Sequence, residues 1–83
     1  MFAEILNILS KLTNVSIERK IRDKNNIVNE ITVSKYNNFF GIGFGFVTHG
    51  NTDEEASKEA IFKLFGKLKW YYTIKIEKCL KLK

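Results

Sequence analysis

The sequence of 83 residues has no proline, a single cysteine (Cys79) and a single histidine (His49). One cysteine excludes an internal disulfide and a cysteine-cluster metal site, and it suits a reducing compartment. No apolar run approaches the roughly 20 residues that a membrane-spanning helix needs. The N-terminus lacks the basic start and the small-residue cleavage site of a secretory signal. We therefore expect a soluble chain that has no membrane partner.

Residues that could support catalysis are also few. His49 has no paired base or nucleophile near it in the sequence, so we interpret it as a surface turn residue. The acidic run from Asp53 to Glu55 is explained more simply by helix capping than by metal binding. Three glycines spaced two residues apart lie in a strand pattern, whereas a phosphate-binding loop needs its glycines in the turn between a strand and a helix. We predict no enzyme activity, no catalytic or metal-binding residue, no cofactor and no small-molecule substrate.

The composition fits one small folded domain that spans residues 1–83. Hydrophobic residues make up 45% of the chain and include seven phenylalanines, enough for one core. The net charge of +5 is unevenly placed, because seven lysines from Lys63 onward face only one acidic residue, Glu77. This asymmetry favours a polyanionic partner, with a solubilising lysine-rich surface as the alternative.

The most informative stretch runs from residue 36 to residue 69. Strand periodicity divides its first part into an aromatic face, made of Phe40, Ile42, Phe44 and Phe46, and a glycine face, made of Phe39, Gly41, Gly43, Gly45 and Val47. Glycines inside a strand cost stability, so they indicate a bulge or the close approach of another backbone or a ligand. We expect such an approach on the glycine face.

A helix is predicted over residues 52–69. Thr52 is a suitable N-cap, and Glu55 can reach back to the N–H of the cap, which forms a capping box. The residues spaced for one apolar stripe are Ala56, Ala60, Ile61, Leu64, Phe65 and Leu68. We expect this stripe to pack against the phenylalanine face of the preceding strand.

The rest of the chain supplies a helix and two more strands. A helix is predicted over residues 1–12, and its core-facing stripe is Phe2, Ile5, Leu9 and Leu12, widened by Leu6 and Ile8. Alternating residues predict strands at 15–22 and 27–36, joined by a polar turn at 23–26 and followed by an asparagine turn at 37–38. Residues 71–83 alternate again and predict a fourth strand or an extended arm. The three strands within residues 15–48, placed between two helices, indicate an α+β fold with an antiparallel meander.

Residues 31–76 resemble the N-terminal domain of ribosomal protein five of the small subunit. The glycine strand ITVSKYNNFFGIGFGF, the helix EEASKEAIFKLFGKLK and the exit around Ile74–Ile76 carry the resemblance. It implies the helix, three strands, helix arrangement of double-stranded-RNA-binding domains. It also implies a structural role against ribosomal RNA, with neighbouring small-subunit proteins as further partners. Phe46 and Val47 stand where that family has Lys-Ala, residues 48–52 form an extra turn, and the family's second domain is missing, so the chain would be a truncated or split copy.

The expected function is therefore to bind ribosomal RNA as a component of the small ribosomal subunit. The richness in Lys, Asn, Ile and Phe suggests AT-rich coding, from which we expect an organellar, first of all mitochondrial, ribosome, or otherwise a cytoplasmic location. We expect close backbone approach at Gly41, Gly43 and Gly45. The side chains expected to contact phosphates are Arg19, Lys20, Arg22, Lys35, Lys63 and Lys67. Trp70, Tyr71 and Tyr72 could stack on bases or pack in the core.

Two other resemblances give alternative functions. The segment VTHGNTDEEASKEAI is similar to the turn and helix of HicB-type antitoxins, which favours a protein-interaction module such as an antitoxin or a phage-type inhibitor. The element order also resembles a stand-alone double-stranded-RNA-binding domain. That family has two lysines at the helix start, where this chain has Asp53, Glu54 and Glu55.

Overall fold

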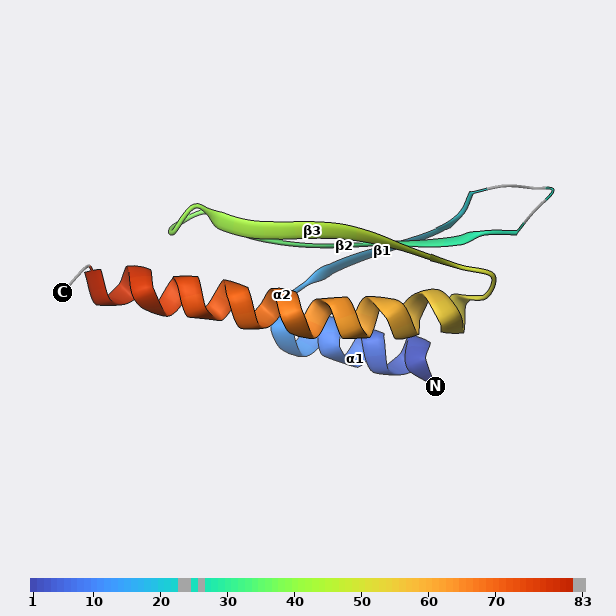
Figure 1. The fold of residues 1–83 in the computed structure, drawn as a ribbon, viewed down its shortest axis with the longest axis horizontal. Helices are drawn as coiled ribbons and strands as arrows, with labels where there is room; N and C mark the ends of the chain where they lie inside the picture. Colours follow the sequence, from blue (N-terminus) through green and yellow to red (C-terminus); the bar gives the residue numbers. More distant parts are fainter. Residues whose placement is uncertain (23–24, 26, 82–83) are drawn as a thin grey trace.

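The computed structural model describes residues 1–22, 25 and 27–81. In chain order, its elements are α1 (Phe2–Thr13), β1 (Ser16–Ile21), β2 (Asn29–Asn37), β3 (Ile42–Gly50) and α2 (Asp53–Lys81). Both helices lie on the same side of the sheet (Figure 1). The α+β order of helix, three-stranded antiparallel sheet and helix is thus confirmed. The turn expected at residues 23–26 lies outside the described residues except for Asn25.

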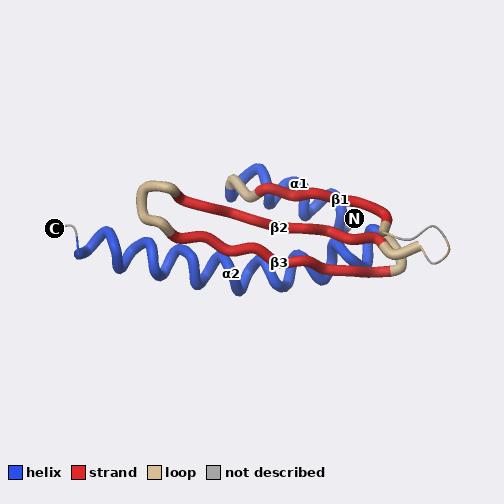
Figure 2. Tube along the Cα trace, turned by 90° about the horizontal axis from the view of Figure 1, so that it is seen from above, coloured by secondary structure: helices blue, strands red, loops and turns tan. Residues whose placement is uncertain are grey.

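The sheet is an antiparallel meander with β2 in the middle (Figure 2). Val33 of β2 is opposite Ile17 of β1 and Phe46 of β3, so these three residues point to the same face. Ile31 and Val33 have no exposed surface, because this face of β2 is covered by α2. The core therefore lies between one face of the sheet and the two helices.

Small residues allow α2 to approach the sheet closely. Ala56, Ala60 and Leu64 are completely buried, and Leu68 and Tyr71 continue the same stripe at 8% and 2% exposure. Phe44 and Phe46 of β3 are partly buried against this core. The predicted packing of the phenylalanine face on the helix stripe is confirmed, although Phe65 is 55% exposed and lies outside the stripe.

The start of α2 matches its predicted capping signal. The N–H of Glu55 donates to Thr52 Oγ1 at 3.1 Å, as an N-cap requires. The carboxylate of Glu55 accepts from the N–H of Asn51 at 3.1 Å, one residue before the predicted partner. Thr52 and Glu55 therefore fix the point where α2 begins.

The strand or arm predicted over residues 71–83 is wrong for residues 71–81, which continue α2 as helix; residues 82–83 lie outside the described part. No glycine or proline follows Gly66, so the sequence has no stop signal at Lys69. The short alternation after Tyr71 fits a helical spacing as well as a strand spacing. Burial of Tyr71 and a hydrogen bond from Lys78 Nζ to the carbonyl of Phe40 (3.0 Å) hold this part of the helix under the β2–β3 turn.

The β2–β3 turn is longer than predicted, since β3 begins at Ile42 and residues 39–41 belong to the turn. Asn37 organises it: its side-chain oxygen accepts from the N–H of Phe40 at 2.9 Å, and its carbonyl accepts from the N–H of Gly41 at 2.9 Å. Gly41 has φ +67°, a left-handed conformation that favours glycine. Gly41 is therefore a turn residue and not a member of the glycine face.

Glu54 of α2 binds the N-terminus of α1. Its carboxylate accepts hydrogen bonds from the Met1 ammonium (2.7 Å), the Phe2 N–H (2.8 Å) and the Ala3 N–H (3.1 Å). These are free donors at the positive end of the α1 dipole, where a negative charge is favoured. The hydrogen bond from the Met1 ammonium, followed by those from Ala3 and Phe2, lowers the pKa of Glu54 to about 2. The acidic start of α2 thus ties the two helices side by side and in parallel.

The predicted core stripe of α1 is partly wrong. Leu6 is fully buried, and Phe2 and Leu9 pack against the core. Ile5 and Leu12, which were expected in the core, are 38% and 77% exposed. The face of α1 that is turned toward the sheet and α2 therefore runs through Phe2, Leu6 and Leu9, while Ile8, which was expected to widen the stripe, is 58% exposed.

Truncation of Leu64 should distinguish the core from the exposed side of the helix layer. We expect Leu64→Ala to lower the free energy of unfolding by about 2–5 kcal/mol, because it removes a fully buried side chain. Leu12→Ala is the matched control and should change it by less than about 0.5 kcal/mol. Urea unfolding followed by circular dichroism measures both, and equal effects would contradict the orientation of α1.

The Glu54 contacts should make stability depend on pH in acid. The folded-state pKa is below the ordinary value of 4.5, so this contribution is fully present above pH 4.5 and is lost as the pH falls toward 2. Glu54→Gln should lower the urea midpoint at pH 6 and flatten its fall between pH 4.5 and 2. Glu18→Gln on β1 is the control and should keep the wild-type slope. A Glu54→Gln profile that runs parallel to wild type would contradict the role of this carboxylate.

Candidate nucleic-acid interface

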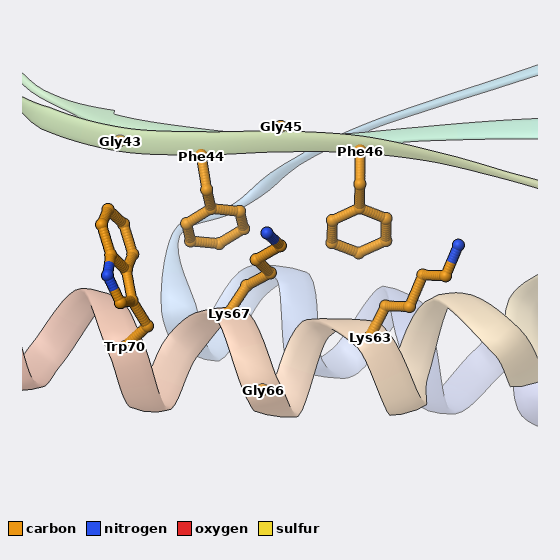
Figure 3. Close-up of a pocket in the computed structure, with 8 residues that line it drawn as sticks. All are labelled: Gly43, Phe44, Gly45, Phe46, Lys63, Gly66, Lys67 and Trp70. Carbon is orange, nitrogen blue, oxygen red and sulfur yellow. The ribbon is translucent and has the colours of Figure 1, made fainter.

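A large open groove lies between β3 and α2. Its volume is about 750 Å3, and its lining residues are Gly43, Phe44, Gly45, Phe46, Lys63, Gly66, Lys67 and Trp70. Phe44 and Phe46 point from β3 toward α2, and Lys67 rises from α2 between the two rings (Figure 3). Aromatic surface and positive charge therefore alternate along one open groove.

Two periodicities build the groove. Phe44 and Phe46 share a strand face, and their rings stack with centroids 6.4 Å apart and planes inclined by 12°. Lys63, Lys67 and Trp70 are four and three residues apart, so they lie along one side of α2. Gly66 lies between them and has no neighbouring atom within 4 Å of the position a Cβ would take, which leaves the groove open there.

The electrostatics of the groove favour an anion. No acidic residue lines it, and Lys67 has no hydrogen-bond or ion-pair partner among the described residues. Lys63 is 3.8 Å from Glu59, and both side chains are about half exposed, so this pair is weak. Trp70 is 47% exposed, which leaves part of its ring free to contact a ligand. β3 is also an edge strand, so one side of its backbone has no strand partner.

Two of the basic residues predicted to contact phosphates are engaged inside the fold. Arg19 donates to Asp53 Oδ1 (3.1 Å), Asn7 Oδ1 (2.7 Å) and the Ala3 carbonyl (3.4 Å), so it joins β1 to both helices. Lys35 Nζ donates to the carbonyls of Thr13 (2.7 Å) and Asn14 (3.3 Å), which end α1. Their contribution to RNA binding stays a prediction, and it would require giving up these contacts.

Lys20 and Arg22 surround a carboxylate at the far end of the sheet. Glu30 Oε2 is 3.3 Å from Lys20, and Glu30 Oε1 is 3.8 Å from Arg22 and 3.0 Å from His49 Nε2. The His49 hydrogen bond, with that of Lys20, lowers the pKa of Glu30. His49 therefore lies in β3 opposite Glu30 and has the carboxylate partner that the sequence did not reveal, so its interpretation as a turn residue is wrong.

Close approach to the glycine face occurs at one position. A Cβ on Gly43 would come within 2.6 Å of the Lys35 carbonyl oxygen and 2.7 Å of the Tyr36 ring, whereas one on Gly45 would meet nothing closer than 3.7 Å. Tyr36 is directly opposite Gly43 in the adjacent strand. The neighbour that approaches Gly43 is thus its own sheet, while Gly45 is open to solvent.

The described residues contain no group of three or more His, Cys, Asp or Glu side chains placed to hold a metal ion. Within the same residues, no helix has the length and apolar character needed to cross a bilayer. The groove offers rings, ammonium groups and an open strand edge, which are groups that can contact a ligand.

The sequence predicted Lys63 and Lys67 as phosphate contacts but did not group them with Phe44, Phe46 and Trp70. The groove aromatics were assigned to the core or left between core and base stacking. The spacing of Lys63, Lys67 and Trp70 around Gly66 is the signal that could have identified a shared helix side.

The two strand glycines should respond differently to substitution. We expect Gly43→Ala to cost about 1–3 kcal/mol of unfolding free energy, because the backbone oxygen of Lys35 cannot move aside easily. Gly45→Ala should change it by less than about 1 kcal/mol. Thermal unfolding of both variants tests this, and equal stability would show that Tyr36 and Lys35 do not constrain Gly43.

No family model matches this chain, and comparisons with curated proteins and with solved structures also find no match. The fold assignment therefore rests on the element order and register.

Proposed function

We propose that this chain is a non-catalytic RNA-binding protein that holds a single strand in the groove between β3 and α2. The observation that carries the proposal is the alternation of Phe44, Lys67, Phe46 and Lys63 along the groove, with Trp70 at one end. Single-stranded nucleic acid is bound by the same combination of stacking rings and cations that follow the backbone.

The chemistry of the groove suits sequence-tolerant binding. Every base has a flat face, so stacking on Trp70 or a phenylalanine is worth about 1–3 kcal/mol per base whatever the base. Lys63 and Lys67 would neutralise phosphates, and release of counterions would then make the affinity fall as salt rises. Neither interaction requires a reaction at the bound strand.

Ribosomal RNA in the small subunit, in an organelle first of all, is the ligand we propose, with neighbouring small-subunit proteins around it. The resemblance of residues 31–76 to the N-terminal domain of ribosomal protein five supports this choice. Phe46 stands where that family has a lysine and lines the groove beside Lys63 and Lys67. Stacking by Phe46 and charge from α2 would take over the role of the missing lysine.

A protein-interaction module, such as an antitoxin or a phage-type inhibitor, is the second candidate. The open edge of β3 favours it, because an extended peptide can add to such an edge as a fourth strand. A partner of this kind would cover the same groove.

RNA binding can be measured directly, since Trp70 is the only tryptophan and lies in the groove. We expect oligouridine to quench its fluorescence. Lys63→Glu/Lys67→Glu should weaken binding roughly ten- to hundred-fold and reduce the slope of log K against log salt by about 1.4, the value for two phosphate contacts on a single strand.

The matched control changes the same net charge away from the groove, in Lys11→Glu/Lys58→Glu. Lys58 lies on the α1 side of α2, 5.6 Å from the Phe2 ring. Equal losses in both double variants would mean that only overall charge matters and would overturn the groove. Sedimentation of a cell or organelle extract at high salt tests the ribosomal part: migration with the small subunit supports it, and migration with one small protein supports the second candidate.

A further inference from the structure

The helix layer has an uncovered side that faces away from the sheet. Large apolar side chains on this side are between 38% and 77% exposed, and we call them the underside face: Ile5, Ile8, Leu12, Phe62, Phe65, Tyr72, Ile76 and Leu80. Helical periodicity places Phe62 and Phe65 at a different angle around the α2 axis from the groove residues Lys63 and Lys67. The underside face and the groove are therefore on different sides of α2.

The spacing of the underside face along α2 is that of a coiled-coil seam. Positions 62, 65, 69, 72 and 76 follow steps of three and four residues, and four of the five residues are apolar. The buried stripe through Leu64, Leu68 and Tyr71 already covers the sheet. A helix that packs only against the core of its own domain needs one apolar stripe. α2 has two such stripes, the buried one and the underside face.

The uncovered area matches what a stable interface needs. A large side chain has on the order of 200 Å2 of accessible surface, so the exposed fractions of the eight residues leave roughly 900 Å2 uncovered. The largest apolar patch of a typical monomer is about 300–600 Å2, and a standard interface buries about 800 Å2 on each partner.

We propose that the underside face binds a second copy of this chain, with the two α2 helices antiparallel and related by a two-fold axis near Lys69. Antiparallel pairing places the basic C-terminal end of one α2 toward the acidic N-terminal end of the other, so that the two helix dipoles are opposed, while Asp53, Glu54 and Lys78 keep their contacts within each chain. A parallel pair would bring like ends together. The opposed dipoles favour the antiparallel orientation, and the seam spacing and uncovered area of the underside face favour a second copy as the partner.

The shape of the monomer fits the same arrangement. α2 extends well beyond the end of α1 (Figures 1 and 2). Positions 62 and 76 are each seven residues from Lys69, so Phe62 of one copy meets Ile76 of the other, and Phe65 lies near Tyr72. The free end of each α2 then lies along the α1 side of the other copy, where Ile8 and Leu12 are exposed.

Lys69 is the one charged residue of the seam, and the axis brings its two copies together. Each ammonium must extend to solvent while its methylene groups stay in the interface. A single charged seam position sets register and lowers affinity. Removing this charge should therefore strengthen association.

Analytical ultracentrifugation of the full chain tests the proposal. We expect a dimer with Kd in the micromolar range or below, which Phe62→Lys converts to a folded monomer. Phe39→Lys is the matched control, because Phe39 is 80% exposed in the β2–β3 turn and should leave the dimer intact. Lys69→Leu should lower Kd roughly tenfold or more, a gain that misfolding cannot imitate when circular dichroism and the unfolding transition are unchanged.

Cross-linking in a Cys79→Ser background tests the orientation. Positions 58 and 80 are each eleven residues from Lys69, so mixed chains that carry Lys58→Cys and Leu80→Cys should form a disulfide between them under mild oxidation. Leu80→Cys alone should not cross-link to itself. Self-cross-linking of Leu80→Cys would overturn the antiparallel arrangement.

Other occupants of the face would give different results. A wild-type chain that stays monomeric at hundreds of micromolar overturns the proposal. If that monomer binds phosphatidylcholine vesicles containing phosphatidylserine and Phe62→Lys does not, the face belongs to a membrane surface. A dimer that Phe62→Lys leaves unchanged would place the interface elsewhere and also overturn the proposal. None of these results depends on whether RNA binds in the groove.

Discussion

The contact between the inner face of β2 and the small-residue stripe of α2 is the constraint on which the rest of this structure depends. A three-stranded sheet with one apolar face needs a cover, and Ile31 and Val33 obtain it from Ala60 and Leu64, all fully buried. The alanines set how near α2 can come. The position of α2 determines the surroundings of its other sides. One side lies along the edge of β3, another lies beside α1, and a third faces away from the sheet. The groove and the underside face both follow from this single placement.

The parts of the fold that were predicted from the sequence rest on local signals. Thr52 and Glu55 are three residues apart and mark the helix start, while Phe44 and Phe46 define a strand face by alternation alone. Residues 71–81 were predicted as a strand or arm because their short alternation fits a strand spacing as well as a helical spacing. The sequence before them contains no signal that would end the helix, and α2 continues through them. The candidate site was found only in part, since Lys63 and Lys67 meet Phe44 and Phe46 across a chain separation that no local pattern encodes.

The same limit applies to charge. Arg19, Lys35 and Glu54 were interpreted from their own neighbourhoods, as phosphate contacts or as a negative charge at a helix start. Each instead connects elements far apart in the chain: Glu54 holds the first residues of α1, Arg19 joins β1 to both helices, and Lys35 covers the end of α1. Local sequence patterns do not reveal partners that lie this far away along the chain. The apolar residues of α1 show the opposite error. Ile5 and Leu12 were predicted in the core because they are apolar, but no neighbouring element buries them.

The lysines of the groove have a consequence for the free protein. Strand edges that lack a partner are prone to pair with one another, and positive charge beside an edge opposes this. Lys63 and Lys67 stand next to the open edge of β3, among phenylalanine rings that would otherwise favour sheet-to-sheet stacking. The two side chains are therefore placed where positive charge opposes the pairing of one such edge with another. An anionic ligand that neutralised them would at the same moment cover the edge, so the opposing charge would be lost only when it is no longer needed.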